Sequence, residues 1–484
     1  MKYPDLSSRR ARLAIRFFTY GVMTVTTVAL SAILLFLALG YRFDKKNLTF
    51  SQGALIQLRS RPEGANILVD NAKLGFNTPG KIIVSAGGHQ VSMSLNGYRP
   101  WSKTVTVQPG QLLWLNYIRL VPDSITTRVI KQFPELNAAR FSPDRRWLAL
   151  QPSAAQPLLL LADLRNEQKP AFSDWAFTLP PLPPGTAQSI EIVEWDLGGR
   201  FLLIKRTVGQ AQSFFRLDRE KPAEALAVNP VLPGAPAVSA VHFAGTNGDV
   251  IYVLTAAGEL RRLSLSAGGG GDLLASGVTQ FNVYRGDMLW YIADRQNVRQ
   301  VGVIKNSRDS VPITYPAGTP LRVALSSYFG HDYLAVADAN RVSLIRDPAE
   351  TAGVASSDFA SFKTDQSSVD WLYFSANGRM LVAQQQANLT VYDLETNQIF
   401  RRSFPLGAQE PARKLGWLDD YYFWLDFGGN LRIVEFDGSN ERFISSVHSG
   451  FEASFSENGQ VLFSVGQNTL TKAFELQASN MIAQ

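Results

Sequence analysis

The side chains that most often carry out chemistry are scarce in this chain. Its 484 residues include no cysteine and only four histidines, which are His89, His242, His331 and His448. The lack of cysteine excludes disulfide scaffolds, cysteine nucleophiles, iron–sulfur clusters and thiolate zinc sites. With so few imidazoles, histidine-rich metal chemistry is also disfavoured.

The remaining candidate groups do not form a catalytic pattern. Asp419 and Asp420 are adjacent carboxylates, but neighbouring residues on a strand or turn point apart, which disfavours paired acid–base work. The run Gly268–Gly271 is followed by Asp272 and lacks the lysine of a phosphate-binding loop. Zinc-protease, nucleophile-elbow and calcium-loop motifs do not occur in the sequence. We therefore predict that the protein is not an enzyme and has no catalytic residue, no cofactor and no metal ligand.

The charge distribution argues against a nucleic-acid partner. The net charge is +6, but residues 1–16 carry five basic side chains and one acid. The remaining residues carry 47 − 5 = 42 basic and 41 − 1 = 40 acidic side chains, a balance of only +2. The part of the chain after residue 16 is close to neutral, so it lacks the excess positive charge that phosphate binding requires.

The N-terminal region has the pattern of a membrane anchor. A basic tail, residues 1–16, precedes Phe17–Gly40, which contains no charged residue. A helix of this length spans about 36 Å, enough for a hydrocarbon core of about 30 Å. A cleaved signal peptide is the alternative, but its apolar region is usually shorter and ends in a clear cleavage site. Five cations precede the span and three follow it, which predicts a cytoplasmic N-terminus and an extracytoplasmic body.

Residues 48–121 form short alternating runs that are broken by glycine and proline, which predicts a small β-sandwich. The turns Ser60-Arg61-Pro62-Glu63-Gly64-Ala65, Gly75-Phe76-Asn77-Thr78-Pro79, Gly88-His89 and Gly97-Tyr98 occur in a characteristic order. This segment resembles the PEGA domain, which is named for its Pro-Glu-Gly-Ala turn.

Local geometry explains the residue types in these turns. Pro62 fixes φ ahead of a tight turn, and Gly64 permits an unusual φ. Asn71 stands where the family usually has glycine, and asparagine also tolerates the left-handed conformation. The resemblance implies an extracytoplasmic spacer or adhesion module. A ligand-binding role for Glu63 or His89 is the alternative, and a purely structural role is the expected one.

The remaining residues, 125–484, contain a repeated unit: an aromatic residue, a polar turn and a short hydrophobic strand. The aromatic anchors are 54, 48, 41, 44, 46, 43 and 38 residues apart. Spacings near 40–50 with three or four strands each indicate β-propeller blades, eight in number or seven if one unit is miscounted. The turns resemble those of TolB-type or WD40-like blades. The anchors are Phe141, Trp195, Phe243, Tyr284, Tyr328, Phe374, Trp417 and Phe455.

Three details of the propeller follow from the same pattern. His242 and His331 lie at or just after blade anchors, where structural hydrogen bonding is the expected role. Pro180–Pro184 is expected to be a stiff surface loop, with a polyproline ligand as the alternative. The last unit offers only three strands, which we expect at residues 452–455, 461–465 and 470–476. Residues 126–132 are otherwise unassigned, so we predict that they complete the final blade.

The order of anchor, PEGA module and propeller resembles that of envelope proteins from small-genome bacteria. The sequence therefore predicts an all-β protein with a single N-terminal transmembrane helix. Its predicted function is a membrane-anchored, extracytoplasmic scaffold that binds an envelope protein, peptide or glycan. The alternative is a propeller hydrolase or a subunit of an envelope enzyme complex. We expect the loops Pro180–Gly185 and Gly268–Asp272 to vary with the ligand.

Overall fold

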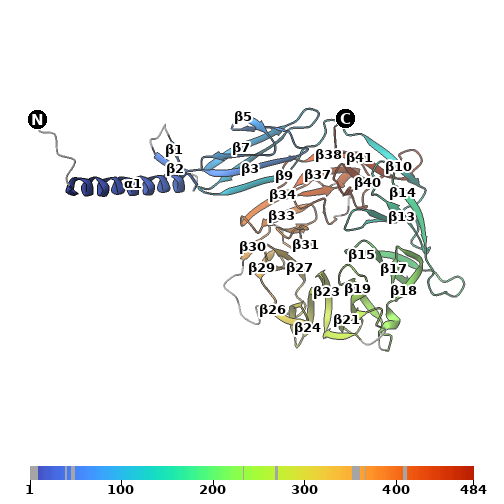
Figure 1. The fold of residues 1–484 in the computed structure, drawn as a ribbon. Coiled ribbons are helices and arrows are strands. Elements are labelled where there is room, and N and C mark those ends of the chain that lie inside the picture. Colours follow the sequence, from blue (N-terminus) through green and yellow to red (C-terminus); the bar gives the residue numbers. More distant parts are fainter. Residues whose placement is uncertain are drawn as a thin grey trace, which may run out of the picture. The chain divides into compact units, whose positions relative to one another are not determined.

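The chain divides into two compact units, which are described separately. Unit 1 comprises Met1–Ser124 with Ala483–Gln484, and unit 2 comprises Ile125–Ile482. Figure 1 shows the ribbon of both units, coloured along the sequence. The computed structural model describes residues 9–38, 41–44, 49–232, 234–267, 271–350, 360–365, 367–406, 411 and 413–483.

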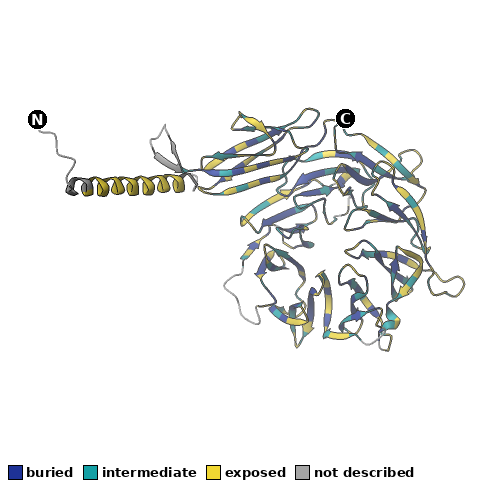
Figure 2. Cartoon of the chain, in the orientation of Figure 1, coloured by how far each residue is buried: buried dark blue, intermediate teal, exposed yellow. Residues whose placement is uncertain are grey.

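Unit 1 begins with a long apolar helix, α1 (Arg9–Ala38). Its span Ile15–Phe36 is long and apolar enough to cross a membrane, although a signal sequence near an N-terminus has the same properties. Figure 2 shows the span Ile15–Phe36 of this helix as exposed. The hydroxyls of Thr19, Thr24 and Thr27 donate to backbone carbonyls four residues earlier, at 2.7, 2.9 and 2.9 Å. These bonds remove the cost of placing hydroxyl groups in an apolar medium.

The helix predicted for residues 17–40 is confirmed, but it starts earlier, at Arg9, and residues 39–40 lie outside the described part. A short hairpin that the sequence analysis did not predict follows the helix. It pairs β1 (Tyr41–Asp44) with β2 (Thr49–Gln52) in antiparallel fashion.

The rest of unit 1 is the predicted β-sandwich. One sheet has the order β6-β3-β9 and the other has the order β5-β4-β7-β8. Pairing is antiparallel except that β3 and β9 run parallel. The strand β5 was not predicted. The bounds are β3 (Ala54–Arg61), β4 (Asn66–Val69), β5 (Ala72–Asn77), β6 (Gly80–Val84), β7 (Gly87–Ser94), β8 (Trp101–Val107) and β9 (Leu112–Arg119).

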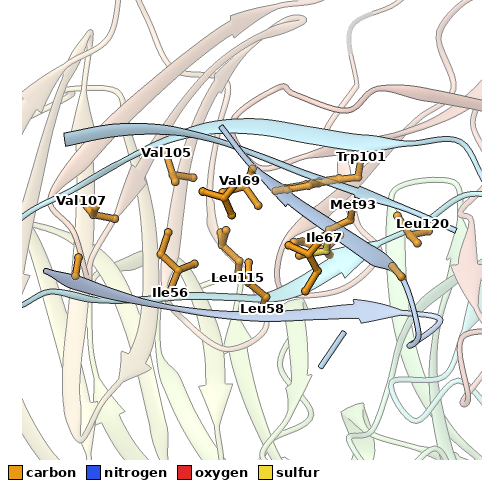
Figure 3. Packing of buried hydrophobic residues seen from close by; sticks show 14 of the residues in the cluster. Ile56, Leu58, Ile67, Val69, Met93, Trp101, Val105, Val107, Leu115 and Leu120 are labelled. Carbon is orange, nitrogen blue, oxygen red and sulfur yellow. The ribbon is translucent and has the colours of Figure 1, made fainter. Parts of the chain in front are cut away.

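The sandwich core lies between its two sheets (Figure 3). Along β3 every second residue is buried, so Ile56 and Leu58 point inward while Gln57 and Arg59 face solvent. Met93 from β7 and Trp101 from β8 fill the core from the other sheet. The period-two pattern in the sequence therefore matches the faces of the sheet. Unit 1 also contains Ala483, whose backbone N–H donates to the Tyr98 hydroxyl at 2.9 Å.

Unit 2 is a β-propeller with eight four-stranded sheets in its described part, which confirms the larger blade number. The first strand of each blade lies toward the middle of the ring, as β15, β19, β23, β27 and β31 show in Figure 1. Blades 1 to 4 are β11 (Ala138–Phe141), β12 (Trp147–Gln151), β13 (Leu158–Asp163), β14 (Ala171–Ala176); β15 (Ser189–Trp195), β16 (Phe201–Val208), β17 (Ala211–Asp218), β18 (Lys221–Ala227); β19 (Val238–Phe243), β20 (Val250–Thr255), β21 (Leu260–Ser264), β22 (Asp272–Ala275); and β23 (Val278–Arg285), β24 (Met288–Arg295), β25 (Val298–Lys305), β26 (Arg308–Pro316).

Blades 5 to 7 follow in the same way, and blade 8 takes one strand from the start of the unit. Two short 3₁₀ helices, Asn229–Val231 and Phe427–Gly429, lie in connections. The strands are β27 (Leu321–Tyr328), β28 (His331–Asp338), β29 (Arg341–Arg346), β30 (Ala360–Lys363); β31 (Trp371–Phe374), β32 (Met380–Gln385), β33 (Asn388–Asp393), β34 (Gln398–Ser403); β35 (Gly416–Trp417), β36 (Tyr422–Leu425), β37 (Asn430–Glu435), β38 (Arg442–Ser446); and β39 (Ser454–Phe455), β40 (Val461–Gln467), β41 (Phe474–Asn480) with β10 (Thr127–Phe133).

Ring closure follows the prediction for residues 126–132. β10 pairs with β41 in antiparallel fashion, so the two ends of the propeller share blade 8. The third strand of the last unit is Phe474–Asn480, however, and not residues 470–476 as expected. Polar side-chain bonds explain the shift, because the Asn468 carboxamide accepts from the N–H groups of Leu470 and Thr471 and forms a turn there.

Hydrophobic clusters join neighbouring blades. One cluster combines Leu148 and Ala162 of blade 1 with Phe463 and Leu476 of blade 8. The next combines buried residues of blades 1 and 2, among them Trp175. Because each blade buries its faces against the blades on either side, a closed ring leaves few apolar faces exposed.

Candidate functional site

The Pro-Glu-Gly-Ala turn of unit 1 is held by one buried hydroxyl. Thr78 Oγ1 accepts from the Ala65 N–H at 3.0 Å and lies 2.7 Å from Ser60 Oγ. The Gly64 N–H donates to the Thr78 carbonyl at 2.9 Å, and Gly64 has the positive φ expected, +89°. Glu63 is ion-paired with Arg59 at 2.8 Å on the surface. The motif therefore fixes two turns to each other, which is a structural role.

His89 also has a structural role in unit 1. Its Nδ1 lies 2.6 Å from Asp70 Oδ2 and its Nε2 lies 2.8 Å from the Ser85 carbonyl oxygen. Both ring nitrogens thus face acceptors, an arrangement that the doubly protonated imidazolium satisfies. Asp70 and Asn71 have φ of +50° and +66°, which confirms the left-handed turn predicted at Asn71.

The two histidines near blade anchors, His242 and His331, are hydrogen-bonded, as expected. His242 Nδ1 lies 2.9 Å from Glu194 Oε2, and His331 Nδ1 lies 2.8 Å from Asp347 Oδ2. The sequence placed them at similar positions of the repeat, but they occupy different strands. His242 lies on β19, the first strand of its blade, whereas His331 starts β28, a second strand. Each binds its own carboxylate and the two do not form a common site.

Asp419 and Asp420 have separate partners. Asp419 accepts from the N–H groups of Tyr421 and Tyr422, both at 2.9 Å. Asp420 accepts from the Asn377 N–H of the preceding blade at 2.8 Å, and burial raises the pKa of its carboxyl. The prediction that they do not act as an acid–base pair agrees with this geometry.

Of the two loops expected to vary with the ligand, the structure describes only the proline-rich run in full. Residues 181–184 of the proline-rich run lie outside any strand, and the Pro180 carbonyl accepts from Arg206 at 2.7 Å. This bond ties the run to blade 2. Of the glycine-rich loop, residues 268–270 lie outside the described residues.

A cavity of about 440 Å³ lies among the first strands of blades 6, 7, 8 and 1. Its lining is aromatic and cationic, and it includes the segment Arg413–Trp417 that leads into and forms β35. The Trp424 indole lies across Gly416, where an added Cβ would fall 1.9 Å from the indole nitrogen. Only glycine at 416 therefore allows this indole to form the wall. The lining residues are Arg140, Tyr373, Phe374, Arg413, Lys414, Leu415, Gly416, Trp417, Trp424, Asp426, Gly450, Phe451 and Glu452.

Both carboxylates of the cavity are occupied by arginines. Asp426 accepts from Arg413 at 3.0 Å and from the Gly450 N–H at 2.8 Å. Glu452 of blade 8 is ion-paired with Arg140 of blade 1 and also accepts from a backbone N–H of blade 1 at 3.4 Å. These pairs hold the walls of the cavity together across the blades.

Lys414 is different, because no carboxylate pairs with it among the residues that the structure describes. Its ammonium lies 4.7 Å from the centre of the Tyr373 ring, within cation–π distance. The side chain is solvent-accessible, yet protein surrounds it on most sides, and this desolvation lowers its pKa from 10.5.

A buried glutamine fixes the backbone on both sides of Lys414. Gln384 Nε2 donates to the Arg413 carbonyl at 2.5 Å, and Gln384 Oε1 accepts from the Leu415 N–H at 3.1 Å. The same oxygen accepts from the Tyr373 hydroxyl at 3.0 Å. Lys414 and the ring beneath it are therefore oriented by one amide.

The sequence analysis did not identify this cavity. Its residues come from four blades, and Arg140 and Glu452 are 312 positions apart. The basic pair Arg413-Lys414 shortly before the anchor Trp417 was the available signal. Across the described ranges, no group of three or more histidine, aspartate or glutamate side chains could hold a metal ion.

The comparisons define the class of protein. Residues 54–122 match the family model of the PEGA domain. Together with the eight-bladed ring and α1, this match identifies a PEGA domain and β-propeller protein with one N-terminal apolar helix. No curated protein matches the chain.

Solved structures that resemble the chain contain propellers at low sequence identity. The structure of the Dos1 propeller is 13% identical, with a TM-score of 0.48, and the alignment covers 74% of this chain and 95% of that one. The Cps50 (Swd1) β-propeller domain of Myceliophteria thermophila is 14% identical, with a TM-score of 0.37 and coverage of 72% and 98%. The dihydro-heme d1 dehydrogenase NirN in complex with DHE is 17% identical, with a TM-score of 0.45. That alignment covers 64% of this chain and 66% of NirN.

Proposed function

We propose that this protein is a membrane-anchored binding protein of the cell envelope, with its propeller as the interaction module outside the cytoplasm. In this proposal the PEGA domain is a spacer or adhesion module. The observation that carries the proposal is α1, whose apolar span Ile15–Phe36 is exposed throughout. An exposed apolar surface of this length requires a lipid environment.

Charge supports the orientation. The five cations of residues 1–16 outnumber the three that follow the span, and cytoplasmic flanks carry the excess of lysine and arginine. The residues after position 16 have a balance of only +2, which favours a protein, peptide or glycan partner over nucleic acid.

Binding without turnover is favoured over hydrolysis. A hydrolase needs a carboxylate or imidazole that is free to move a proton. In the cavity, Glu452 and Asp426 are each held by an arginine and a backbone N–H. If the protein hydrolysed a peptide or glycan and Glu452→Gln abolished that activity, the enzyme alternative would replace this proposal.

Single engineered cysteines test the orientation, because the natural chain has none. Ser7→Cys lies before the span, and Lys221→Cys replaces a side chain that is 61% exposed on the propeller. A membrane-impermeant maleimide applied to intact cells, or to spheroplasts where an outer membrane exists, is expected to label only the Lys221→Cys variant. Ser7→Cys should react only after lysis, and the reverse pattern would contradict the orientation.

The same preparation separates an anchor from a cleaved signal sequence. The intact mass of protein from the membrane fraction is expected to include residues 1–40. A mass that corresponds to a chain starting after residue 40, in the soluble fraction, would show that α1 is removed.

A further inference from the structure

The charged groups of the propeller cavity leave one cation available. Three cations line it, Arg140, Arg413 and Lys414, against the two carboxylates Glu452 and Asp426. Each carboxylate is paired with one arginine. Among the residues that the structure describes, the lining therefore has one positive charge in excess, and the Lys414 ammonium carries it.

The Lys414 side chain is oriented before any ligand arrives. Gln384 holds the backbone at Arg413 and Leu415, and the Tyr373 ring lies 4.7 Å from the ammonium. Because Gln384 is fully buried and uses both ends of its amide, the clamp has little freedom to move. An anion bound here gives the ammonium a charged partner, which no described carboxylate provides as an ion pair.

The other walls favour a ligand with an apolar body. Phe374, Phe451 and Trp424 contribute aromatic surface. A sugar presents several hydroxyls that each need a partner, whereas each of the two carboxylates already pairs with an arginine and a backbone N–H. A single carboxylate attached to an apolar side chain matches one cation with aromatic walls. The volume of about 440 Å³ lies within the range of roughly 300–1,000 Å³ typical of ligand sites.

We propose that this cavity binds the C-terminal carboxylate of a peptide or protein whose last side chain is aromatic or aliphatic. The carboxylate contacts Lys414 Nζ, and the last side chain lies against Phe374, Phe451 and Trp424. This inference rests on the proposed function and specifies its partner.

The test measures binding of fluorescent hexapeptides that end in phenylalanine to the full chain in detergent. Peptides with a free terminal carboxylate are expected to bind at least about tenfold more tightly than the same peptides with a terminal amide. Lys414→Gln should remove that difference, and Lys414→Arg should retain most of it. Lys169→Gln is the matched control, because Lys169 is an exposed lysine in a loop of blade 1 outside the cavity.

Three results would overturn the inference. They are equal affinity for the acid and the amide, a preference for the acid that survives Lys414→Gln, and an absence of binding. If an oligosaccharide containing glucuronate bound in a Lys414-dependent way while the peptides did not, the peptide assignment would be wrong. Near-ultraviolet circular dichroism of each variant shows whether the propeller remains folded. The cysteine-labelling pattern is independent of these results, so failure here leaves the proposed orientation standing.

Discussion

At the residue scale, the recurring aromatic-serine turns are a structural device of the propeller. Ser142, Ser375 and Ser456 each accept with Oγ from the N–H five residues later, at 3.0 Å in all three cases. Their own N–H groups donate to the carbonyl of that same residue at 2.8–2.9 Å. Two hydrogen bonds thus join the serine to the residue five positions later. This structural role explains why the motif recurs without implying catalysis.

The glycine in this turn gives a sharp stability prediction. Gly378 has φ of +79°, and an added Cβ would lie 2.2 Å from the Ser327 carbonyl oxygen of the preceding blade. Gly330 has nearly the same φ, +82°, but open space around it. We expect Gly330→Ala to lower the free energy of unfolding by about 1 kcal/mol, because only the positive φ is penalised. Gly378→Ala should cost about 2–4 kcal/mol, because the backbone of a neighbouring blade must also move.

Urea unfolding of the two alanine variants measures this difference. Because the substitution and the backbone conformation match, the comparison isolates the contact between blades. Equal losses of stability would show that Ser327 does not constrain Gly378.

The pair of His89 and Asp70 predicts a pH dependence in unit 1. Desolvation is the largest single influence and lowers the pKa of His89, but hydrogen bonds to Asp70 and Ser85 raise it overall above 6.5. The hydrogen bond from His89 holds the pKa of Asp70 below 3.8. The contribution of His89 is thus present below pH 6.5 and is lost as pH rises through its folded pKa. That of Asp70 is present above pH 3.8 and is lost as pH falls through its folded pKa.

We therefore expect the pair to stabilise unit 1 most between these limits and less at alkaline pH. Imidazole resonances measured by NMR across pH test the raised pKa of His89, which His89→Gln identifies among the four histidines. The free energy of unfolding of the His89→Gln variant should not show the decrease that we expect for the natural protein as pH rises above 6.5. A His89 pKa at or below 6.5 would contradict the prediction.

At the scale of elements, closure of the propeller depends on β10. Its pairing with β41 supplies the outermost strand of blade 8 and covers the edge that β41 would otherwise leave unpaired, and long unpaired edges promote aggregation. Thr127 and Ser479, 352 positions apart, also share a side-chain hydrogen bond of 2.8 Å. The two ends of the unit are therefore joined by both backbone pairing and a side-chain hydrogen bond.

We expect deletion of residues 127–133 to abolish cooperative unfolding of the propeller or to cause aggregation. The control removes seven residues from 351–359, a segment that contributes no described strand. Circular dichroism during heating, together with light scattering, measures both effects. An unchanged melting transition in the 127–133 deletion would rule out closure by this strand.

At the scale of the whole molecule, charge and apolar surface are divided along the chain. The excess of basic residues precedes α1, the apolar surface lies on α1, and the residues beyond it are close to neutral. This division fits our proposal of a tether followed by folded units, in which we place the binding chemistry in a cavity and not on a charged surface. The topology and peptide-binding experiments thus address different parts of one molecule.

Much of the fold was predictable because its signals are local. A continuous run of uncharged residues predicted α1, and the alternation of apolar and polar residues predicted the faces of β3. The residue types in the turns predicted the left-handed conformation at Asn71. The aromatic anchors predicted the blades because their turns are local, and in the three anchors that are followed by serine the turn closes five residues after that serine. Even closure by residues 126–132 followed from a count of strands.

Tertiary structure alone decided the parallel pairing of β3 with β9 and the existence of the cavity. Alternation specifies which side chains face the core, but it does not specify which strand lies alongside. The pairing of Arg140 with Glu452 joins residues from the start and end of the ring, so it exists only once the ring has closed. Because Glu452 pairs with Arg140 and Asp426 pairs with Arg413, Lys414 is the described cation of the cavity that can pair with a ligand. The sequence by itself therefore determined the elements and their order. Ring closure determined the site, because it brings together residues of neighbouring blades that are far apart in the sequence.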